Sequence, residues 1–125
     1  MSHFAEIHTQ IRDIAALQAA CAELGLQMLE NTEARGYNTN RIHGDYVVRL
    51  KGPFDVALQR QLDGGFLMIA DLWQGHVEKE LGSNFGRLKQ LYGVHKTMLE
   101  ARKRGLTVRR HQLSGGAVRL ALCRV

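Results

Sequence analysis

The chain has 125 residues, of which 45% are hydrophobic and 23% charged, and its formal net charge is +5 at pH 7. These proportions are ordinary for a folded domain, and they exclude a disordered tail, a collagen-like fibre and a low-complexity linker. No apolar run approaches the roughly 20 residues of a membrane-spanning helix, and the first residues lack the pattern of a signal peptide. We therefore expect a single domain over residues 1–125, cytoplasmic and not in a membrane.

Charge is divided unevenly along the sequence. Residues 1–83 hold seven Lys or Arg against eleven Asp or Glu, whereas residues 84–125 hold ten Lys or Arg against one acid, Glu100. Such a split is typical of a chain that binds an acidic partner, such as a nucleic acid, an anionic surface or an acidic protein. It is equally consistent with two halves that lie side by side and attract each other, and the sequence leaves both interpretations open.

The first half of the chain predicts one helix among several strands. Residues 4–11 have the composition and partial alternation of a strand. Asp13 is a good N-cap for a helix over 13–24, because its carboxylate can accept hydrogen bonds from the free amides of the first turn, and Gly25 favours an end there. The stretch 31–44 is polar and poorly patterned, so we expect a long loop, either without regular structure or with a short strand near Tyr37. Further strands are expected at residues 26–30, 46–50, 54–60 and 66–70.

The second half predicts a long helix followed by a hairpin. A wide apolar stripe opposite a polar face indicates a helix over about 84–104, with Ser83 as its N-cap. Residues 106–112 and 117–125 are expected to pair across the glycine-rich turn between them. The last turn of the helix is basic, which is favourable against the negative end of the helix dipole.

These elements together predict an α+β fold. Long strands with tight turns imply a mainly antiparallel sheet, and two amphipathic helices can cover one face of it as a two-layer sandwich. The run 66–70 is the most continuously apolar, which is typical of a central strand buried on both faces. The other face of the sheet would be free, and it could bind a partner.

Several segments carry a resemblance to a known family. They are Met1-Ser2-His3-Phe4, Phe54-Asp55-Val56-Ala57-Leu58, Ile69-Ala70-Asp71, Gln90-Leu91-Tyr92-Gly93-Val94 and Gly105-Leu106-Thr107-Val108. In these the chain resembles an uncharacterised family first noted as hypothetical chloroplast open reading frame thirty-five, which occurs in plastids, cyanobacteria and other bacteria. The chain departs from that pattern at Leu91, where Arg is usual, at Val94, where Tyr is usual, and at Val125, where an aromatic residue is usual. The resemblance implies no particular activity.

No familiar catalytic or metal-binding motif is present. The six histidines form no HExxH or His/Cys cluster, and Cys21 and Cys123 are too far apart for a CxxC site, so we expect neither a metal nor a cofactor. Both cysteines are expected to be buried in a reducing cytosol. Asp55, Asp71 and His95 are the residues around which an unrecognised enzyme site would form, although turn capping is the plainer role for both aspartates.

A basic constellation near the C-terminus is the candidate binding surface. Lys89, Lys96 and Lys103 recur every seven residues and so line one face of the predicted helix. Long cationic side chains of this kind contact phosphates, but a solvated charged face is the plainer alternative. The predicted partner-binding residues are Lys89, Lys96, Arg102, Lys103, Arg104, Arg109, Arg110 and Arg119.

We therefore expect a non-enzymatic interaction or adaptor module that docks on a macromolecular partner. The alternative is a nucleic-acid-binding module that uses the basic C-terminal third. Single-strand binders also stack bases on aromatic side chains, and only Trp73 and Tyr92 lie near the basic constellation. Gly86 and Gly93, one heptad apart on the polar face of the helix, either permit close approach of another backbone or are simply tolerated. The partner and the oligomeric state stay open.

Overall fold

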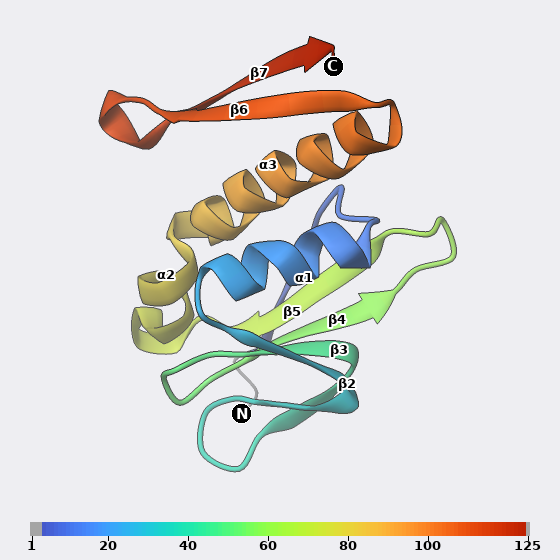
Figure 1. Ribbon diagram of the computed structural model, residues 1–125. Helices are drawn as coiled ribbons and strands as arrows, with labels where there is room; N and C mark the ends of the chain where they lie inside the picture. Colours follow the sequence, from blue (N-terminus) through green and yellow to red (C-terminus); the bar gives the residue numbers. More distant parts are fainter. Residues whose placement is uncertain (1–3, 125) are drawn as a thin grey trace.

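The computed structural model describes residues 4–124, and it places a layer of helices between two antiparallel sheets (Figure 1). The larger sheet has the strand order β1-β5-β4-β3-β2. Its strands are β1 (Phe4–His8), β2 (Gln27–Arg35), β3 (Arg41–Arg49), β4 (Val56–Arg60) and β5 (Phe66–Asp71). The helices are α1 (Ile14–Glu23), α2 (His76–Leu81) and α3 (Gly86–Lys103), and the second sheet consists of β6 (Leu106–Gln112) and β7 (Val118–Arg124).

The α+β prediction is confirmed: a mainly antiparallel sheet carries the helices on one face. Met1, Ser2, His3 and Val125, which the resemblance and the predicted last strand included, lie outside the described residues. Within residues 4–124, no helix combines the length and the apolarity that crossing a lipid bilayer requires.

Helix α1 forms as its sequence predicts. The Asp13 Oδ1 atom accepts a hydrogen bond from the Ala16 amide at 3.2 Å, which caps the helix. The apolar side chains of Leu17, Ala20 and Cys21 are buried, and they pack with α3 and the main sheet in one core. The helices therefore cover the sheet face that carries Val48, Leu58 and Met68, among others.

Strand β5 is buried along its whole length, from Phe66 to Asp71. Every residue of the strand is buried, so the predicted burial on both faces is confirmed. In the strand order it lies between β1 and β4, and β4 is the middle strand of the five. Helices cover one face of β5. The other face is covered by the ends of β2 and β3 that carry Ala34 and Ile42, where the structure differs from the prediction.

The predicted loop over 31–44 is wrong, because β2 and β3 form one long hairpin there. Their pairing runs from Gln27↔Arg49 to Arg35↔Arg41, with a break between Glu30↔Tyr46 and Thr32↔Gly44. The hairpin bends halfway: Asn31 has a positive φ of 48°, and a Cβ atom on Gly44 would collide with the Tyr46 carbonyl oxygen. Glycine is required at that close approach.

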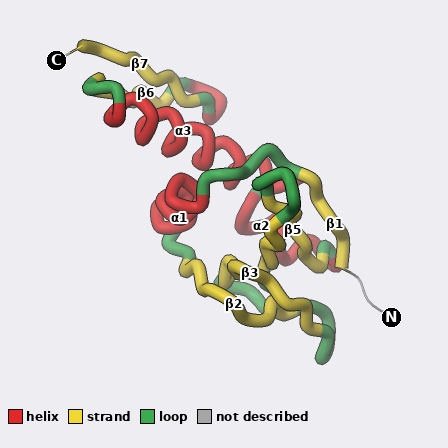
Figure 2. The backbone as a smooth tube through the Cα atoms, turned by 90° about the vertical axis from the view of Figure 1, so that its right-hand side faces the viewer, coloured by secondary structure: helices red, strands yellow, loops and turns green. Residues whose placement is uncertain are grey.

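The bend folds the outer half of the β2–β3 hairpin over the second face of the main sheet. Ala34, which is fully buried, and Ile42 belong to the outer half, and they pack in one cluster with Val47, Ala57, Leu67 and Ile69. The turn between β2 and β3 reaches β1, where a Cβ atom on Gly36 would lie 2.5 Å from the Phe4 ring. Figures 1 and 2 show this hairpin curling around the end of the sheet. The expectation of a free sheet face is therefore wrong.

The C-terminal hairpin stands apart from the main sheet. In Figure 1, α3 separates it from α1 and the larger sheet. Helix α3 begins at Gly86, after Phe85 in a left-handed conformation (φ 60°), and no side chain caps it, so the predicted N-cap at Ser83 is wrong. Gly105 has a positive φ of 73° directly after the helix and turns the chain into β6, as glycine readily does.

Candidate functional site

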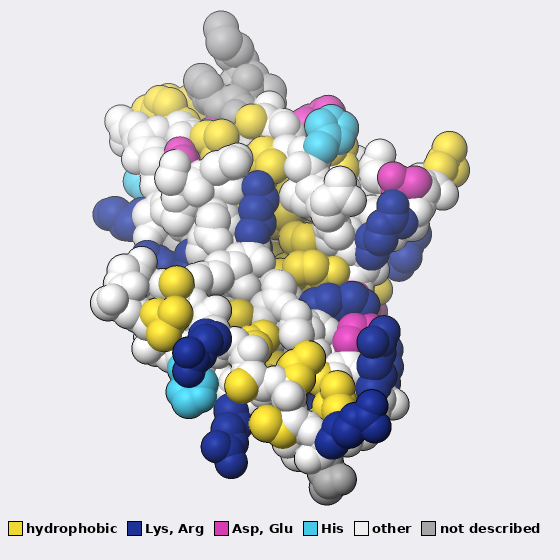
Figure 3. All heavy atoms as spheres, turned by 90° about the horizontal axis from the view of Figure 1, so that it is seen from above, with side chains coloured by type: hydrophobic (Ala, Val, Ile, Leu, Met, Phe, Trp, Pro, Cys, Tyr) yellow, Lys and Arg dark blue, Asp and Glu magenta, His cyan; other side chains and the backbone are white. Residues whose placement is uncertain are grey.

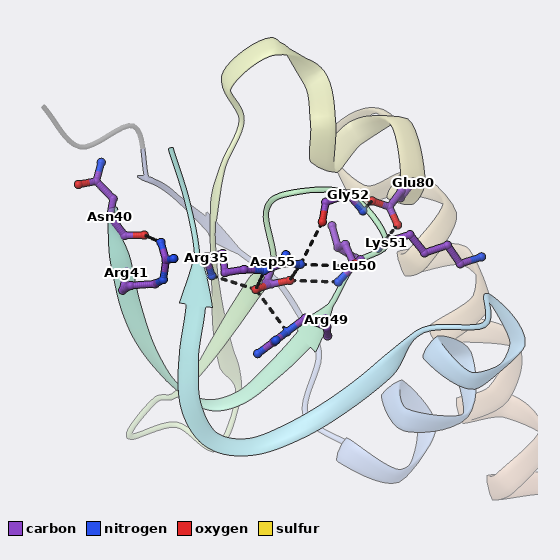
Figure 4. A network of polar contacts seen from close by, with 9 residues as sticks. All are labelled: Arg35, Asn40, Arg41, Arg49, Leu50, Lys51, Gly52, Asp55 and Glu80. Carbon is purple, nitrogen blue, oxygen red and sulfur yellow. Dashed lines mark hydrogen bonds and ion pairs between the residues drawn. The ribbon is translucent and has the colours of Figure 1, made fainter. Parts of the chain in front are cut away.

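Asp55 is fully buried at the point where the tip of the β2–β3 hairpin meets β4 (Figure 4). Its Oδ2 atom accepts hydrogen bonds from the backbone N–H and the Nε–H of Arg35, at 2.9 and 2.8 Å. Its Oδ1 atom accepts from Arg35 Nη2 at 2.8 Å and from the Leu50 amide at 3.2 Å. The carboxylate is therefore saturated with donors that belong to the fold.

The electrostatics keep Asp55 ionised. Burial alone would raise the pKa of this carboxyl, but hydrogen bonds from Arg35 and from the Leu50 amide outweigh burial and lower the pKa below its ordinary value. A second cation, Arg49, has its Nε atom 3.5 Å from Asp55 Oδ2. Such an arrangement stabilises a charge in place, which is the opposite of what a general acid needs at neutral pH.

Asp71 is fully buried and also holds backbone. Its Oδ2 atom accepts from the Tyr37 amide at 2.7 Å, and its Oδ1 atom accepts from the Trp73 amide at 2.9 Å. Both aspartates thus fasten the tip of the β2–β3 hairpin. His95, the third residue of the hypothetical enzyme site, instead contacts Glu23 of α1, so the structure does not bring these three residues together.

Glu23 at the end of α1 joins three elements. Its carboxylate pairs in bidentate fashion with Arg110 of β6, with both N–O distances 2.8 Å, and its Oε1 atom lies 2.8 Å from His95 Nε2 of α3. The hydrogen bonds from Arg110 hold the pKa of Glu23 at about 2, well below its ordinary value. This cluster, which sequence reasoning missed, ties the C-terminal hairpin to the helices.

Two lysines of the predicted heptad stripe are also paired within the fold. Lys96 Nζ lies 3.1 Å from Asp13 Oδ2 and 3.0 Å from Glu100 Oε1. Lys103 Nζ lies 3.5 Å from the same Glu100 oxygen. The pKa of Asp13 is lowered, first of all by the hydrogen bond from Lys96. Attraction between the acidic and basic parts of the chain therefore accounts for Lys96, through Asp13, and for Arg110, through Glu23. Lys103 instead pairs with Glu100 of its own helix.

Four predicted residues remain exposed around the C-terminal hairpin. Within residues 4–124, no carboxylate lies within 4.0 Å of their guanidinium groups. We call this set the hairpin surface: Arg102, Arg104, Arg109 and Arg119. In Figure 3, which looks down on this hairpin, Lys and Arg side chains gather around a hydrophobic patch.

Strand alternation explains why Arg109 and Arg110 differ. Arg110 reaches Glu23 on the helical side of the small sheet. Successive side chains point to opposite faces, so Arg109 lies on the outer face. His111 is two residues further along β6, and Arg119 is its partner on β7, so both share that outer face.

The hairpin also presents backbone and apolar groups. In the described part of the chain, β6 and β7 pair only with each other, so each has an open edge. The side chains of Leu122 and Leu113 are 50% and 43% exposed. Leu122 shares the helical face of the hairpin with Arg110 and borders α3, whereas Leu113 lies at the turn. An open strand edge with exposed arginines and a leucine at the turn is a surface that another chain can cover.

Lys89, the eighth predicted residue, lies apart from the hairpin surface. It lies near the start of α3, facing the segment that follows β1. Of the eight predicted residues, the structure thus leaves four exposed around the C-terminal hairpin, uses three in internal ion pairs and puts one in a separate cleft.

The aromatic side chains do not lie on the hairpin surface. Tyr92 accepts hydrogen bonds at its hydroxyl from the Arg12 and Asp13 amides, at 3.2 and 3.1 Å. Trp73 packs edge-to-face on Tyr37 with ring centroids 4.5 Å apart, and Tyr37 is held by Asp71 of the main sheet. No aromatic residue occurs between residues 93 and 124.

The remaining candidate groups are the metal-ligand side chains, the two cysteines and the two glycines of α3. Among the described residues, no three His, Cys, Asp or Glu side chains are grouped so as to hold a metal ion. Cys21 is buried, which raises the pKa of its thiol to about 12, but Cys123 is exposed, contrary to expectation. A Cβ atom at Gly86 or Gly93 would meet nothing within 4 Å. Within residues 4–124, no other element of this fold therefore packs closely against these two glycines.

Comparison with known proteins gives one match. The model of a family described as a protein of unknown function (DUF1257) matches residues 20–121, from α1 into β7. The match includes the Glu23–Arg110 junction, the buried Asp55 and the hairpin surface. No curated protein and no solved structure matches the chain.

Proposed function

The chain belongs to the DUF1257 family, and we propose that it is a non-enzymatic interaction module that docks on an acidic protein through its hairpin surface. One observation carries the proposal. Three cations of the C-terminal region are paired within the fold, whereas the four arginines of the hairpin surface have no acidic partner among the described residues. These four are available for a partner's carboxylates.

The surroundings of these arginines favour a protein as the partner. Protein interfaces combine exposed apolar side chains with arginine and with backbone hydrogen bonds. The hairpin region has all three, because its arginines are exposed, Leu113 is exposed at the turn, and both strands have an open edge. Single-strand nucleic-acid binders rely on stacking of bases on large aromatic rings, and residues 93–124 hold no Phe, Tyr or Trp.

A nucleic acid is the second candidate, and the exposed guanidinium groups favour it. Four arginines on a phosphate backbone would give binding that weakens steeply with salt, with a log–log slope of roughly −3 to −4 on a duplex. A labelled DNA duplex and a labelled oligouridine, titrated at several salt concentrations, test this candidate by fluorescence anisotropy. Binding of either probe that disappears in an Arg109→Glu, Arg119→Glu variant would replace the protein partner by a nucleic acid.

Site-specific photo-crosslinking in the native cell tests the main proposal. A photoreactive benzoylphenylalanine replaces His111 on the outer face of the hairpin, and the same group at Glu33, exposed on β2, is the control. We expect a protein adduct from position 111, none of the same size from position 33, and loss of the adduct in the Arg109→Glu, Arg119→Glu background. The absence of any adduct specific to position 111 would overturn the proposal.

The proposal also includes a more specific family relationship and a cellular compartment. The segments quoted from the sequence support a relationship between this chain and the hypothetical chloroplast open reading frame thirty-five family. A buried Cys21 and a distant, unpaired Cys123 support a reducing cytoplasmic compartment, where thiols persist without a disulfide.

A further inference from the structure

A cleft lies between the segment that follows β1 and the first turns of α3. Its volume is about 380 Å³. It is lined by His8, Thr9, Gln10, Ile11, Lys89 and Tyr92, and we call it the Lys89 cleft. A cleft of this size, with an apolar wall and a few polar groups, is typical of a small-molecule site.

The walls of this cleft are fixed by hydrogen bonds. The Tyr92 hydroxyl accepts from the Arg12 and Asp13 amides, which fastens α3 to the start of α1. Thr9 Oγ1 donates to the Phe66 carbonyl oxygen and accepts from the Ile11 amide, both at 3.2 Å. Because these bonds are made between groups of the chain itself, ligand binding would cost little additional ordering of the cleft walls.

Lys89 is the charged group of the cleft. It is partly buried, and within residues 4–124 no carboxylate lies within 4.0 Å of its ammonium group. Lys96 and Lys103, one and two heptads further along α3, are both paired with acids. A cation beside apolar groups attracts an anion more strongly than one in bulk water, because the local dielectric constant is lower.

We propose that the Lys89 cleft binds a small amphipathic organic anion. The ligand's carboxylate, phosphate or sulfonate pairs with the Lys89 ammonium, and its apolar or aromatic body lies against Ile11 and the Tyr92 ring. His8, exposed at the edge of the cleft, offers a second hydrogen-bond donor to the acidic group. This site is separate from the hairpin surface, so it goes beyond the proposed docking function.

Two probes with the same aromatic body separate charge recognition from apolar binding. The anionic probe is 8-anilinonaphthalene-1-sulfonate, and the neutral one is N-phenyl-1-naphthylamine. The variant Lys89→Met keeps the length and helix propensity of the side chain but removes its charge. We expect the fluorescence-derived Kd of the sulfonate to rise at least tenfold in this variant, while that of the neutral probe stays within twofold.

The matched control is Lys103→Met, which removes an equal charge from the same helix two heptads away. We expect Lys103→Met to leave both dissociation constants within twofold of wild type. The Arg109→Glu, Arg119→Glu variant, which tests the docking proposal, should also leave them within twofold. Failure of the cleft proposal is therefore distinguishable from failure of the docking proposal. In NMR spectra, we expect addition of the sulfonate to shift the backbone amide resonances of residues 8–11 and 92. The inference is overturned if the wild type binds no sulfonate, if Lys89→Met binds it unchanged, or if Lys103→Met weakens it equally.

Discussion

The two hairpins of this chain are used in opposite ways. The β2–β3 hairpin bends at Asn31 and Gly44 and closes over its own sheet, where buried Asp55 and Asp71 bind its tip. The β6–β7 hairpin rests on α3, is held by the partly exposed Glu23–Arg110 pair and keeps two open edges. The same motif thus seals one surface and leaves another open.

The difference lies in where the charged groups find their partners. Asp55 has no contact with solvent, so its ionised form persists only because Arg35 and backbone amides surround it. The arginines of the hairpin surface are solvated, so they need no partner inside the fold. Binding surfaces are drawn from such loosely held parts of a protein, whereas buried ion pairs hold a structure in one form.

The largest expected effect is at the buried anchor of the β2–β3 hairpin. Asp55→Asn leaves the guanidinium of Arg35 without its carboxylate, which should lower the free energy of unfolding by about 3–5 kcal/mol. Urea denaturation measures the loss. Asp63→Asn is the control, because Asp63 is 71% exposed and its ion pair with Arg12 is worth about 0.5 kcal/mol or less. Equal effects would show that the tip is not anchored by Asp55.

The bend itself is tested at Gly44. In Gly44→Ala, the new Cβ atom meets the Tyr46 carbonyl oxygen and lies 3.1 Å from the Ala57 Cβ atom. Relief of this overlap would straighten the hairpin and uncover Ala34, at a cost of about 1–3 kcal/mol. Increased amide hydrogen exchange in residues 32–35 checks the mechanism. If exchange there were unchanged, the bend would not depend on the missing side chain.

Glu23 tests the attachment of the second hairpin. Glu23→Gln should cost about 1 kcal/mol at pH 7, since a partly exposed pair is weaker than a buried one. The folded-state pKa of about 2 lies below the ordinary value of 4.5. The stabilisation by the ionised Glu23 carboxylate is therefore complete above pH 4.5 and is lost as the pH falls towards 2. The difference in the free energy of unfolding between wild type and Glu23→Gln should accordingly shrink to nothing between pH 4.5 and pH 2. Arg110→Met should reproduce the loss at pH 7, and the two losses should not add.

The smallest effect is expected at Gly93, on the open side of α3. Gly93→Ala adds a methyl group that meets nothing within 4 Å, and it should stabilise the protein by about 0.5–1 kcal/mol. A rise in Tm measures this gain, and probe binding to the Lys89 cleft should be unchanged. A lower Tm would mean that another backbone lies closer to α3 than the structure shows.

Local patterns predicted the elements whose signals are local. Helix α1 has its Asp13 cap and its apolar spacing within a dozen residues, and β5 is one apolar run. The outer half of the β2–β3 hairpin carries no such signal, because its strands are mostly polar and change face at Asn31 and Gly44. The carboxylates that fasten it come 20 and 34 residues later in the chain.

The candidate surface was predictable as a set of cations but not as an arrangement. Glu23 and Arg110 are 87 residues apart, and no spacing rule indicates that they form a pair. The same is true of Lys96 and Asp13, at a separation of 83 residues. Which cations stay available to a partner is a property of the tertiary fold.

The separation of the C-terminal hairpin from the main sheet has a consequence for how the chain can diverge. Side chains on the outer face of β6 and β7, such as Arg109 and Arg119, touch no strand of the sandwich, and exchanges there change stability by about 0.5 kcal/mol or less. Mutations can therefore change the outer face of the hairpin while the rest of the fold stays intact. The fold thus separates the residues that hold the main sheet together from those on the outer face of the hairpin.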